Sequence, residues 1–275
     1  MSRIALLQMT SGIDPAANAA ALTDAIENAA KGGAVMLFTP EMAGLLDSDR
    51  ERADPHVVPE DRSSVLTAVR EAAARAGLWG ALGSLAVARE DGRWANRSFV
   101  IDASGAIVAR YDKIHMFDVD LAGGEAWRES AAYAPGEAVV TVETPLGRLG
   151  LAVCYDIRFP ALFEALGRAR CDVIAIPAAF TVPTGQAHWH LLQRARAVEA
   201  SAYVVAAAQV GKHDDGRRTY GHSLVGDPWG EGVVDMGGRL PGLAFTELDR
   251  ERIADVRRQL PSLANRRPIP KSATT

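Results

Sequence analysis

Short apolar runs alternate with amphipathic stretches along the whole chain. The apolar runs predict strands at residues 4–9, 34–38, 79–88, 98–102, 149–153, 173–176, 203–209, 223–225 and 243–247. Stretches with apolar residues at helical spacing predict helices at residues 16–30, 63–76, 160–169 and 189–200. The segments AVMLF and DVIAI are apolar at nearly every position, which is typical of strands buried on both faces. The alternation therefore predicts an α/β core.

Turn and capping residues mark the ends of the predicted elements. Asp14, which precedes a proline, favours a helix start, and Gly32 with Gly33 ends that helix. No linker rich in proline, glycine or serine divides the sequence into halves. We therefore expect one domain over residues 1–275, with a loosely packed tail after about residue 267.

Composition and charge restrict the possible function classes. Hydrophobic residues make up 48% and charged residues 23% of the 275 residues, as in ordinary globular proteins. The net charge of −4 gives no support for a nucleic-acid or membrane partner. No window approaches the roughly 20 apolar residues of a membrane span, and the N-terminal sequence lacks signal-peptide organisation. Two cysteines suit a reducing compartment, so we expect a cytoplasmic protein.

Three apolar segments run directly into an unusual polar residue. They are AVMLFTPE, which ends at Glu41, IVARYDKIH, which contains Lys113, and GLAVCYD, which contains Cys154. Sites in α/β sheets gather at the carboxyl ends of strands, so these three side chains could meet. A thiolate is a nucleophile, a carboxylate can take the thiol proton, and an ammonium group favours the thiolate. Lys113 could also stabilise an oxyanion, helped by the backbone N–H of Tyr155.

Each of these residues by itself also fits an ordinary structural role. A cysteine in an apolar strand is usually an inert core residue, and we expect this role for Cys171. Glu41 and Lys113 taken singly resemble solvated surface residues. His115 lies near Lys113 in sequence and offers a Cys–His pair as an alternative, although no papain-type segment surrounds Cys154. The combination of the three segments is therefore what favours catalysis.

The segments FTPEM, YDKIHMFD and AVCYDIRFP resemble the three signature blocks of the nitrilase superfamily, the carbon–nitrogen hydrolases. The resemblance extends from Ile4 to about Arg267. It implies an αββα sandwich that pairs into an αββααββα homodimer, and an amidase that needs no cofactor and no metal. It also implies a catalytic set of Glu41, Lys113 and Cys154.

Many members of this superfamily have a second glutamate between the lysine and cysteine blocks. Glu129 in AWRES stands at the matching place, and Glu125 is a close alternative. Later segments, such as AFTVPTGQAHWHLLQRARAVE, resemble the branch of deaminated-glutathione amidases and ω-amidases. This branch implies that Arg158 binds a substrate carboxylate and that Phe180 and Thr184 contact the substrate.

The branch resemblance leaves the substrate open. We expect hydrolysis of the primary amide of a small α-keto acid with release of ammonia, deaminated glutathione being preferred over α-ketoglutaramate. The alternatives are an N-carbamoyl substrate and, in another class, a binding protein that has lost activity. The expected preference comes from a cationic loop at the mouth of the pocket, formed by Lys212, His213, Arg217 and Arg218.

The HWH segment contains two histidines, His188 and His190, and His222 follows further along the chain. A metal site would need a third ligand and supporting carboxylates. A spacing of two residues on a helix points the two imidazoles in different directions, so the sequence favours structural roles for these histidines.

Overall fold

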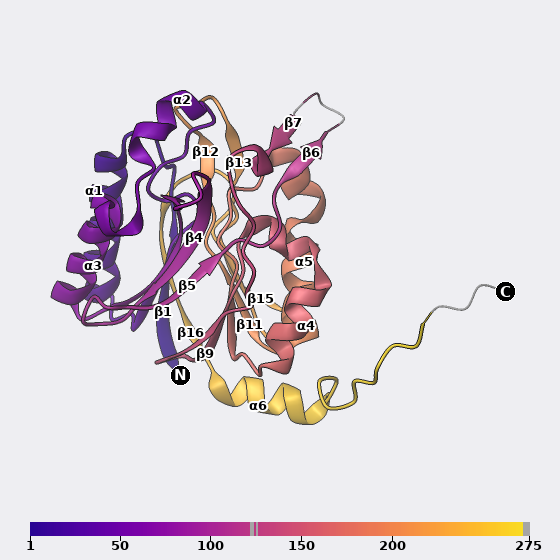
Figure 1. Cartoon of the computed structure of the whole chain (residues 1–275). Coiled ribbons are helices and arrows are strands. Elements are labelled where there is room, and N and C mark those ends of the chain that lie inside the picture. The colour runs from indigo at the N-terminus through magenta and orange to yellow at the C-terminus, as the bar shows by residue number, and fades with distance from the viewer. Residues whose placement is uncertain (122–123, 125, 272–275) are drawn as a thin grey trace.

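Two mixed β-sheets pack face to face and are enclosed by helices in the computed structural model, which describes residues 1–121, 124 and 126–271. Helices α1 (Pro15–Lys31) and α3 (Ser64–Ala76) cover the outer face of one sheet. Helices α4 (Pro160–Arg168) and α5 (Val182–Ala200) cover the outer face of the other (Figure 1). This layering is the αββα sandwich that the sequence resemblance implies.

Within the described residues, each large sheet contains six strands. The first has the order β16-β1-β2-β3-β4-β5 and the second the order β15-β14-β11-β10-β9-β8. The strands of the first sheet are β1 (Ser2–Gln8), β2 (Met36–Phe38), β3 (Trp79–Ala88), β4 (Trp94–Ile101), β5 (Ile107–Asp112) and β16 (Gly242–Leu248). Those of the second are β8 (Thr141–Thr144), β9 (Gly147–Leu151), β10 (Val173–Ala175), β11 (Tyr203–Ala206), β14 (Leu224–Gly226) and β15 (Gly232–Asp235).

Alternation along β1 shows why its sequence is apolar on both faces. Ile4 and Leu6 belong to the core between the two sheets, whereas Ala5 and Leu7 belong to the core beneath α1 and α3. Successive side chains of a strand point to opposite faces, so a central strand of the sandwich is buried on both sides. The strand is therefore apolar at nearly every position because the layered architecture buries both of its faces.

Capping side chains set the ends of the helices as the sequence predicts. Asp14 accepts a hydrogen bond from Ala16 N at the start of α1, and Gly77 ends α3 in the left-handed region with φ of 61°. The other helical segments are α2 (Arg50–Ala53), α6 (Arg250–Gln259), and the 3₁₀ turns η1 (Asp54–His56), η2 (Glu60–Arg62), η3 (Glu129–Ala131) and η4 (Cys154–Arg158).

Helix α5 begins at Val182, seven positions before the predicted start at residue 189. Pro183 lies in the first turn, where its missing N–H costs nothing. Glycine is required at position 185, because a side chain there would collide with the ring of Tyr220. The proline and glycine therefore belong to the helix instead of marking a loop before it.

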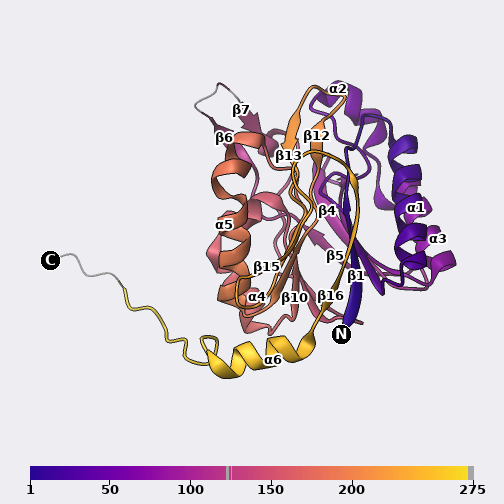
Figure 2. The same ribbon diagram turned by 180° about the vertical axis from the view of Figure 1, so that it is seen from behind.

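Two small hairpins lie at the same end of the sandwich as α2 (Figure 1). They are formed by β6 (Asp118–Asp120) with β7 (Ala126–Arg128), and by β12 (Val210–Lys212) with β13 (Arg218–Tyr220). Helix α6 crosses the opposite end (Figure 2), and residues 267–271 beyond it are exposed. None of the helices in the described part of the chain has the length and apolar composition needed to cross a membrane.

Candidate active site

Glu41, Lys113 and Cys154 lie together at one end of the sandwich. Glu41 and Lys113 follow β2 and β5 of the first sheet, whereas Cys154 follows β9 of the second. Lys113 Nζ lies 3.1 Å from Glu41 Oε1, and Glu41 and Lys113 both lie close enough to the Cys154 thiol to shift its pKa. All three residues are buried. The two sheets thus bring together the three residues that the sequence nominates as catalytic candidates.

Backbone packing and hydrogen bonds fix the position of Glu41. Its Oε1 accepts a hydrogen bond from Asn96 Nδ2 at 2.8 Å, and its Oε2 accepts one from Ala179 N at 2.9 Å. Gly83 on β3 allows this strand to approach closely, because a Cβ there would collide with the carbonyl oxygens of Thr39 and Pro40. The carboxylate is therefore held before any substrate binds.

The second glutamate contacts the same ammonium group. Glu129 Oε2 lies 2.8 Å and Oε1 3.1 Å from Lys113 Nζ, and Oε1 also accepts a hydrogen bond from Asn96 at 3.0 Å. The backbone N–H of Phe117 donates to Glu129 Oε2 at 2.6 Å. The alternative candidate, Glu125, lies outside the described residues. Glu129 thus gives the ammonium group a second carboxylate partner besides Glu41.

Cys154 occupies a sharp turn between β9 and η4. Its φ of 48° lies in the left-handed region, which costs free energy for a residue other than glycine. A hydrogen bond from Cys154 N to Pro177 O at 2.8 Å holds the turn. The first N–H groups of a helix have no acceptor within the helix, so the N–H of Tyr155 at the start of η4 is available to an oxyanion.

The Asp156 carboxylate stabilises this turn through hydrogen bonds. It is fully buried and accepts hydrogen bonds from Val153 N at 2.9 Å and from the Tyr111 hydroxyl at 2.7 Å. The other oxygen accepts from the backbone N–H of His115 at 3.0 Å and contacts His115 Nδ1 at 2.7 Å. His115, considered above as a partner for the thiol, instead pairs with Asp156. One side chain therefore joins the cysteine turn to the segment that carries Lys113.

The electrostatics of the site favour a neutral thiol beside a charged ammonium group. Burial, and next the Glu41 carboxylate, raise the pKa of Cys154 well above its usual value, although Lys113 acts to lower it. Burial alone would lower the pKa of Lys113, but Glu129 and Glu41 outweigh it and raise that pKa well above its usual value. A neutral thiol needs a base before it can act as a nucleophile, and the Glu41 carboxylate lies beside it.

The three residues line a cavity of about 540 Å³, a size typical of small-molecule sites. The predicted substrate-contact residues Tyr155, Arg158, Phe180 and Thr184 also line it. The Arg158 guanidinium lies 5.6 Å from the centre of the Phe180 ring and 5.8 Å from that of Tyr155, and Nη1 contacts His188 Nδ1 at 3.3 Å. A cation in a cavity beside a thiol suits an acidic substrate.

Comparison with known proteins agrees with this geometry. A family model described as carbon–nitrogen hydrolase matches residues 3–258. The chain belongs to the carbon–nitrogen hydrolases. It is 39% identical over 269 residues to the deaminated glutathione amidase of Yersinia enterocolitica, with 97% of this chain and 93% of that protein covered. This similarity places the protein among the amidases of the nitrilase superfamily, which hydrolyse small amides.

Solved structures resemble this carbon–nitrogen hydrolase over most of its length. The NitFhit protein of Caenorhabditis elegans superposes with a TM-score of 0.88 at 36% identity, and the match covers 97% of this chain but 65% of that longer polypeptide. A variant amidase from Nesterenkonia sp. AN1, with acrylamide added to its active-site cysteine, has a TM-score of 0.79 at 27% identity. That match covers 94% of this chain and 98% of the other.

The predicted cationic loop of this carbon–nitrogen hydrolase reaches the cavity through one residue. Arg217 lines the cavity, whereas Lys212 and Arg218 are exposed and are not among its lining residues. His213 is buried and contacts Ser11 O and Thr219 Oγ1, both at 2.8 Å. Burial lowers the pKa of His213, which favours the neutral ring. Of the four residues in the expected cationic loop, Arg217 therefore lines the cavity, Lys212 and Arg218 are solvated, and His213 is buried.

Sequence reasoning missed the roles of three residues of the site. Asn96 donates to both Glu41 and Glu129, yet it is one of several polar positions in β4, and nothing in its sequence pattern distinguishes it. Trp127 lies beneath the Arg217 guanidinium, 4.5 Å from the ring centre. Asp156 was visible within the CYDIRFP segment but was given no role, because its partners Tyr111 and His115 are distant in sequence.

Replacing Asp156 by asparagine is expected to destabilise this carbon–nitrogen hydrolase by at least about 2 kcal/mol and to lower kcat. The amide keeps one accepting oxygen and turns an NH₂ group toward donors that the carboxylate now satisfies. Urea denaturation measures the free energy of unfolding, and steady-state kinetics measure kcat. Tyr111→Phe removes a single hydrogen bond and is expected to cost about 1 kcal/mol. Equal stability of Asp156→Asn and the parent would contradict this role.

Proposed function

We propose that this amidase hydrolyses the amide of a small acidic α-keto acid, deaminated glutathione in particular, through a thioester on Cys154. The contact of the Cys154 thiol with Glu41, beside Lys113 in a cavity that also contains Arg158, carries the proposal. The names of the relatives support the substrate class, since the Yersinia enterocolitica protein and its human counterpart are both deaminated glutathione amidases.

The first half of the reaction forms the acyl-enzyme. Cys154 Sγ attacks the amide carbon while Glu41 takes the thiol proton. The carbonyl oxygen becomes an oxyanion, which Lys113 Nζ and the Tyr155 N–H stabilise. Glu41 then gives its proton to the amide nitrogen, the C–N bond breaks, and the amine leaves. The acid half of the substrate remains bound to sulfur as a thioester.

The second half of the reaction restores the thiol. Glu41 takes a proton from a water molecule as its oxygen attacks the thioester carbon, and the same two donors stabilise the second oxyanion. The C–S bond breaks, the carboxylic acid leaves, and the sulfur regains its proton from Glu41. Glu129 keeps Lys113 in position throughout, because both of its carboxylate oxygens contact the ammonium group.

The leaving group differs between the two candidate substrates. In deaminated glutathione a secondary amide joins the keto acid to cysteinylglycine, so cysteinylglycine leaves as the amine. In α-ketoglutaramate the amide is primary, and ammonia leaves. The expectation of ammonia from both substrates is therefore wrong for deaminated glutathione. Both reactions give α-ketoglutarate, which provides a common measurement, whereas an N-carbamoyl substrate would release carbon dioxide together with ammonia.

Two arginines in the cavity suit the two carboxylates of deaminated glutathione. We assign Arg158 to the keto-acid carboxylate and Arg217 to the carboxylate of the glycine end. Arg217 Nη2 lies 3.3 Å from the buried Asp215, but among the described residues its Nε and Trp127 Nε1 are buried without a hydrogen-bond partner. Both atoms belong to residues that line the cavity. An acceptor group of a ligand would satisfy them.

We expect kcat/KM to be higher for deaminated glutathione than for α-ketoglutaramate, and Arg217→Ala to reduce this ratio about 5-fold to 20-fold. The shorter substrate has no second carboxylate, so its kcat/KM should change less. Formation of α-ketoglutarate measures both reactions. Arg218→Ala, which alters an exposed cation, is the matched control. A parent preference for α-ketoglutaramate would refute the substrate assignment, whereas an unchanged ratio in Arg217→Ala would refute only the role of Arg217.

We infer that the protein forms a homodimer, as the superfamily resemblance implies, and we place the interface on the outer face of α5. Leu191 and Val198 on this helix and Trp229 in the adjoining turn are exposed apolar residues. Arg194 Nε donates to Gly230 O at 2.6 Å and holds that turn against the helix. An exposed apolar patch is typical of an interface.

Sedimentation equilibrium should give twice the chain mass for the parent and the chain mass for Leu191→Glu. The introduced carboxylate would lose its hydration in a closed interface without gaining a partner. Leu240→Glu alters another exposed leucine, away from α5, and should leave the dimer intact. A monomeric parent would exclude this interface.

A further inference from the structure

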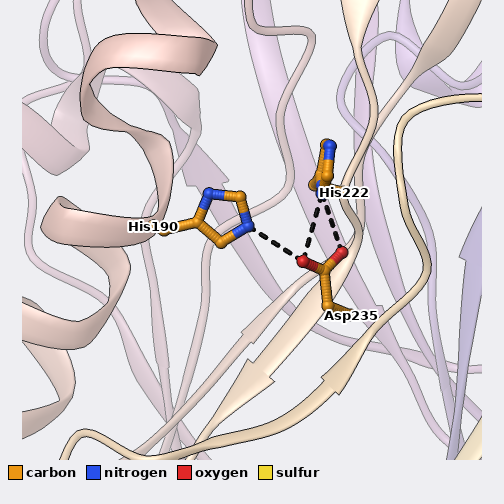
Figure 3. Close-up of side chains that lie close together, drawn as sticks. All are labelled: His190, His222 and Asp235. Atoms are coloured by element: carbon orange, nitrogen blue, oxygen red, sulfur yellow. Dashed lines mark hydrogen bonds and ion pairs between the residues drawn. The ribbon is translucent and has the colours of Figure 1, made fainter.

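Three side chains with metal-binding chemistry meet at a place that the catalytic mechanism does not use. His190 lies on α5, His222 follows β13, and Asp235 ends β15 (Figure 3). His190 Nε2 lies 2.9 Å from Asp235 Oδ2, and His222 Nδ1 lies 2.9 Å from Oδ1 and 3.1 Å from Oδ2. The potential ligand atoms of the three residues all lie within 4.8 Å of one another.

Neighbouring contacts orient these side chains. The His222 ring stacks on Tyr220 with 4.4 Å between ring centres, and the backbone of His222 is held by hydrogen bonds from its N to Gly237 O and from Trp189 Nε1 to its O. Asp235 Oδ1 accepts a hydrogen bond from Gly237 N at 2.9 Å. A ligand set that is already oriented loses less conformational entropy on binding an ion.

The charge and exposure of the three residues suit a cation. The Asp235 carboxylate contacts both imidazoles and accepts a hydrogen bond from Gly237 N, so its oxygens already face the two histidines. The side chains of His190 and Asp235 are 43% and 42% exposed, and that of His222 is 24% exposed, so an ion can reach them from solvent.

We propose that His190, His222 and Asp235 form a binding site for a divalent transition-metal ion, with Zn²⁺ as the reference ion. Two imidazole nitrogens and one carboxylate oxygen favour zinc and its neighbours over Mg²⁺ and Ca²⁺, which prefer oxygen ligands. Ligands about 2.0–2.1 Å from a tetrahedral ion lie roughly 3.3 Å apart, so small side-chain rotations would suffice. Water completes the coordination. The two histidines bind as neutral rings, each keeping one proton on its other nitrogen.

The expected role of the ion is to fasten α5 to the strands beside it. His190 belongs to α5, whereas His222 and Asp235 lie in the segments around β14. The ring of Trp189, next to His190, packs against Phe180 of the cavity wall with 4.9 Å between ring centres. A bound ion would therefore stabilise the elements behind that wall without contacting the substrate.

Titration of the full chain with Zn²⁺, monitored by isothermal titration calorimetry, tests the proposal. Cys154→Ala is the background for every variant, so that the catalytic thiol cannot supply a competing ligand. We expect one equivalent of Zn²⁺ to bind and to raise Tm. His190→Ala and Asp235→Asn should each weaken binding by about 100-fold or more, because loss of a group that merely supports a ligand already costs about 10-fold to 100-fold.

His56→Ala removes an exposed histidine elsewhere on the surface and is the matched control, with binding expected to equal that of the background. Asp235→Asn keeps the shape of the side chain, so it remains informative even if His190→Ala disturbs α5. Absence of zinc binding at stoichiometric concentration, or equal affinity in Asp235→Asn and the background, would overturn the proposal.

Discussion

Replacing Cys154 by alanine is expected to lower kcat by at least about 10⁴-fold while the protein remains folded. Among the described residues that line the cavity, Cys154 is the only thiol, so the two-step route through a thioester is lost. The cavity loses only one sulfur atom, and alanine is small enough for the turn at φ of 48° to persist. Formation of α-ketoglutarate measures the loss, and far-UV circular dichroism verifies the fold.

Cys171→Ala is the matched control, since it removes the second buried thiol. Cys171 lies just before β10, and burial raises its pKa to about 12, so it is a poor nucleophile. We expect this variant to keep most of its activity, with at most a modest loss of stability from the cavity. Near-normal turnover in Cys154→Ala would exclude the thioester mechanism altogether.

Lys113→Arg is expected to lower kcat about 10²-fold to 10³-fold even though the positive charge is kept. Lys113 Nζ is buried and contacts Glu41 at 3.1 Å and Glu129 at 2.8 Å, so it occupies a point defined by both carboxylates. A guanidinium is planar and larger than an ammonium group, so its nitrogens cannot occupy the same point. Steady-state kinetics measure the change.

Lys212→Arg makes the same substitution at an exposed position and should leave kcat unchanged. Thermal unfolding of Lys113→Arg separates a misplaced charge from a protein that no longer folds. Full activity of a folded Lys113→Arg variant would mean that the reaction does not depend on where this cation lies. The proposed oxyanion contact would then be excluded.

The layered fold could be predicted from the sequence because each buried strand is apolar for a local reason. β1 alternates between the core shared by the two sheets and the core beneath α1 and α3, so its residues are apolar on both faces. β3 extends from Trp79 to Ala88, as the sequence predicts. Strands such as β6 (DVD) and β12 (VGK) were missed, because they lack the apolar run that marks the equally short buried strands β2 and β10.

Helices with unusual first turns were harder to predict. The start of α5 contains a proline and a glycine, which ordinarily mark loops. The glycine is needed because of the ring of Tyr220, which lies against Gly185 from a hairpin 35 positions further along the chain. A contact between residues so far apart in the sequence cannot be recognised from the local pattern of apolar and polar residues.

The sequence by itself was enough to nominate Glu41, Lys113 and Cys154 as catalytic candidates. Each follows an apolar strand directly and lies within a recognisable sequence block. Only the tertiary structure decided what surrounds them. Stacking of the two sheets placed the Glu41 carboxylate against the Cys154 thiol, and the fold added Asn96 to the site.

The same distinction applies to the residues outside the catalytic group. The sequence disfavoured a metal site because His188 and His190 point in different directions on one helix, and His188 indeed contacts Arg158 instead. The third ligand, Asp235, comes from a strand 45 positions beyond His190. Periodicity and motifs depend on neighbouring residues, whereas a ligand set or a substrate pocket depends on distances between segments that only the folded chain brings together.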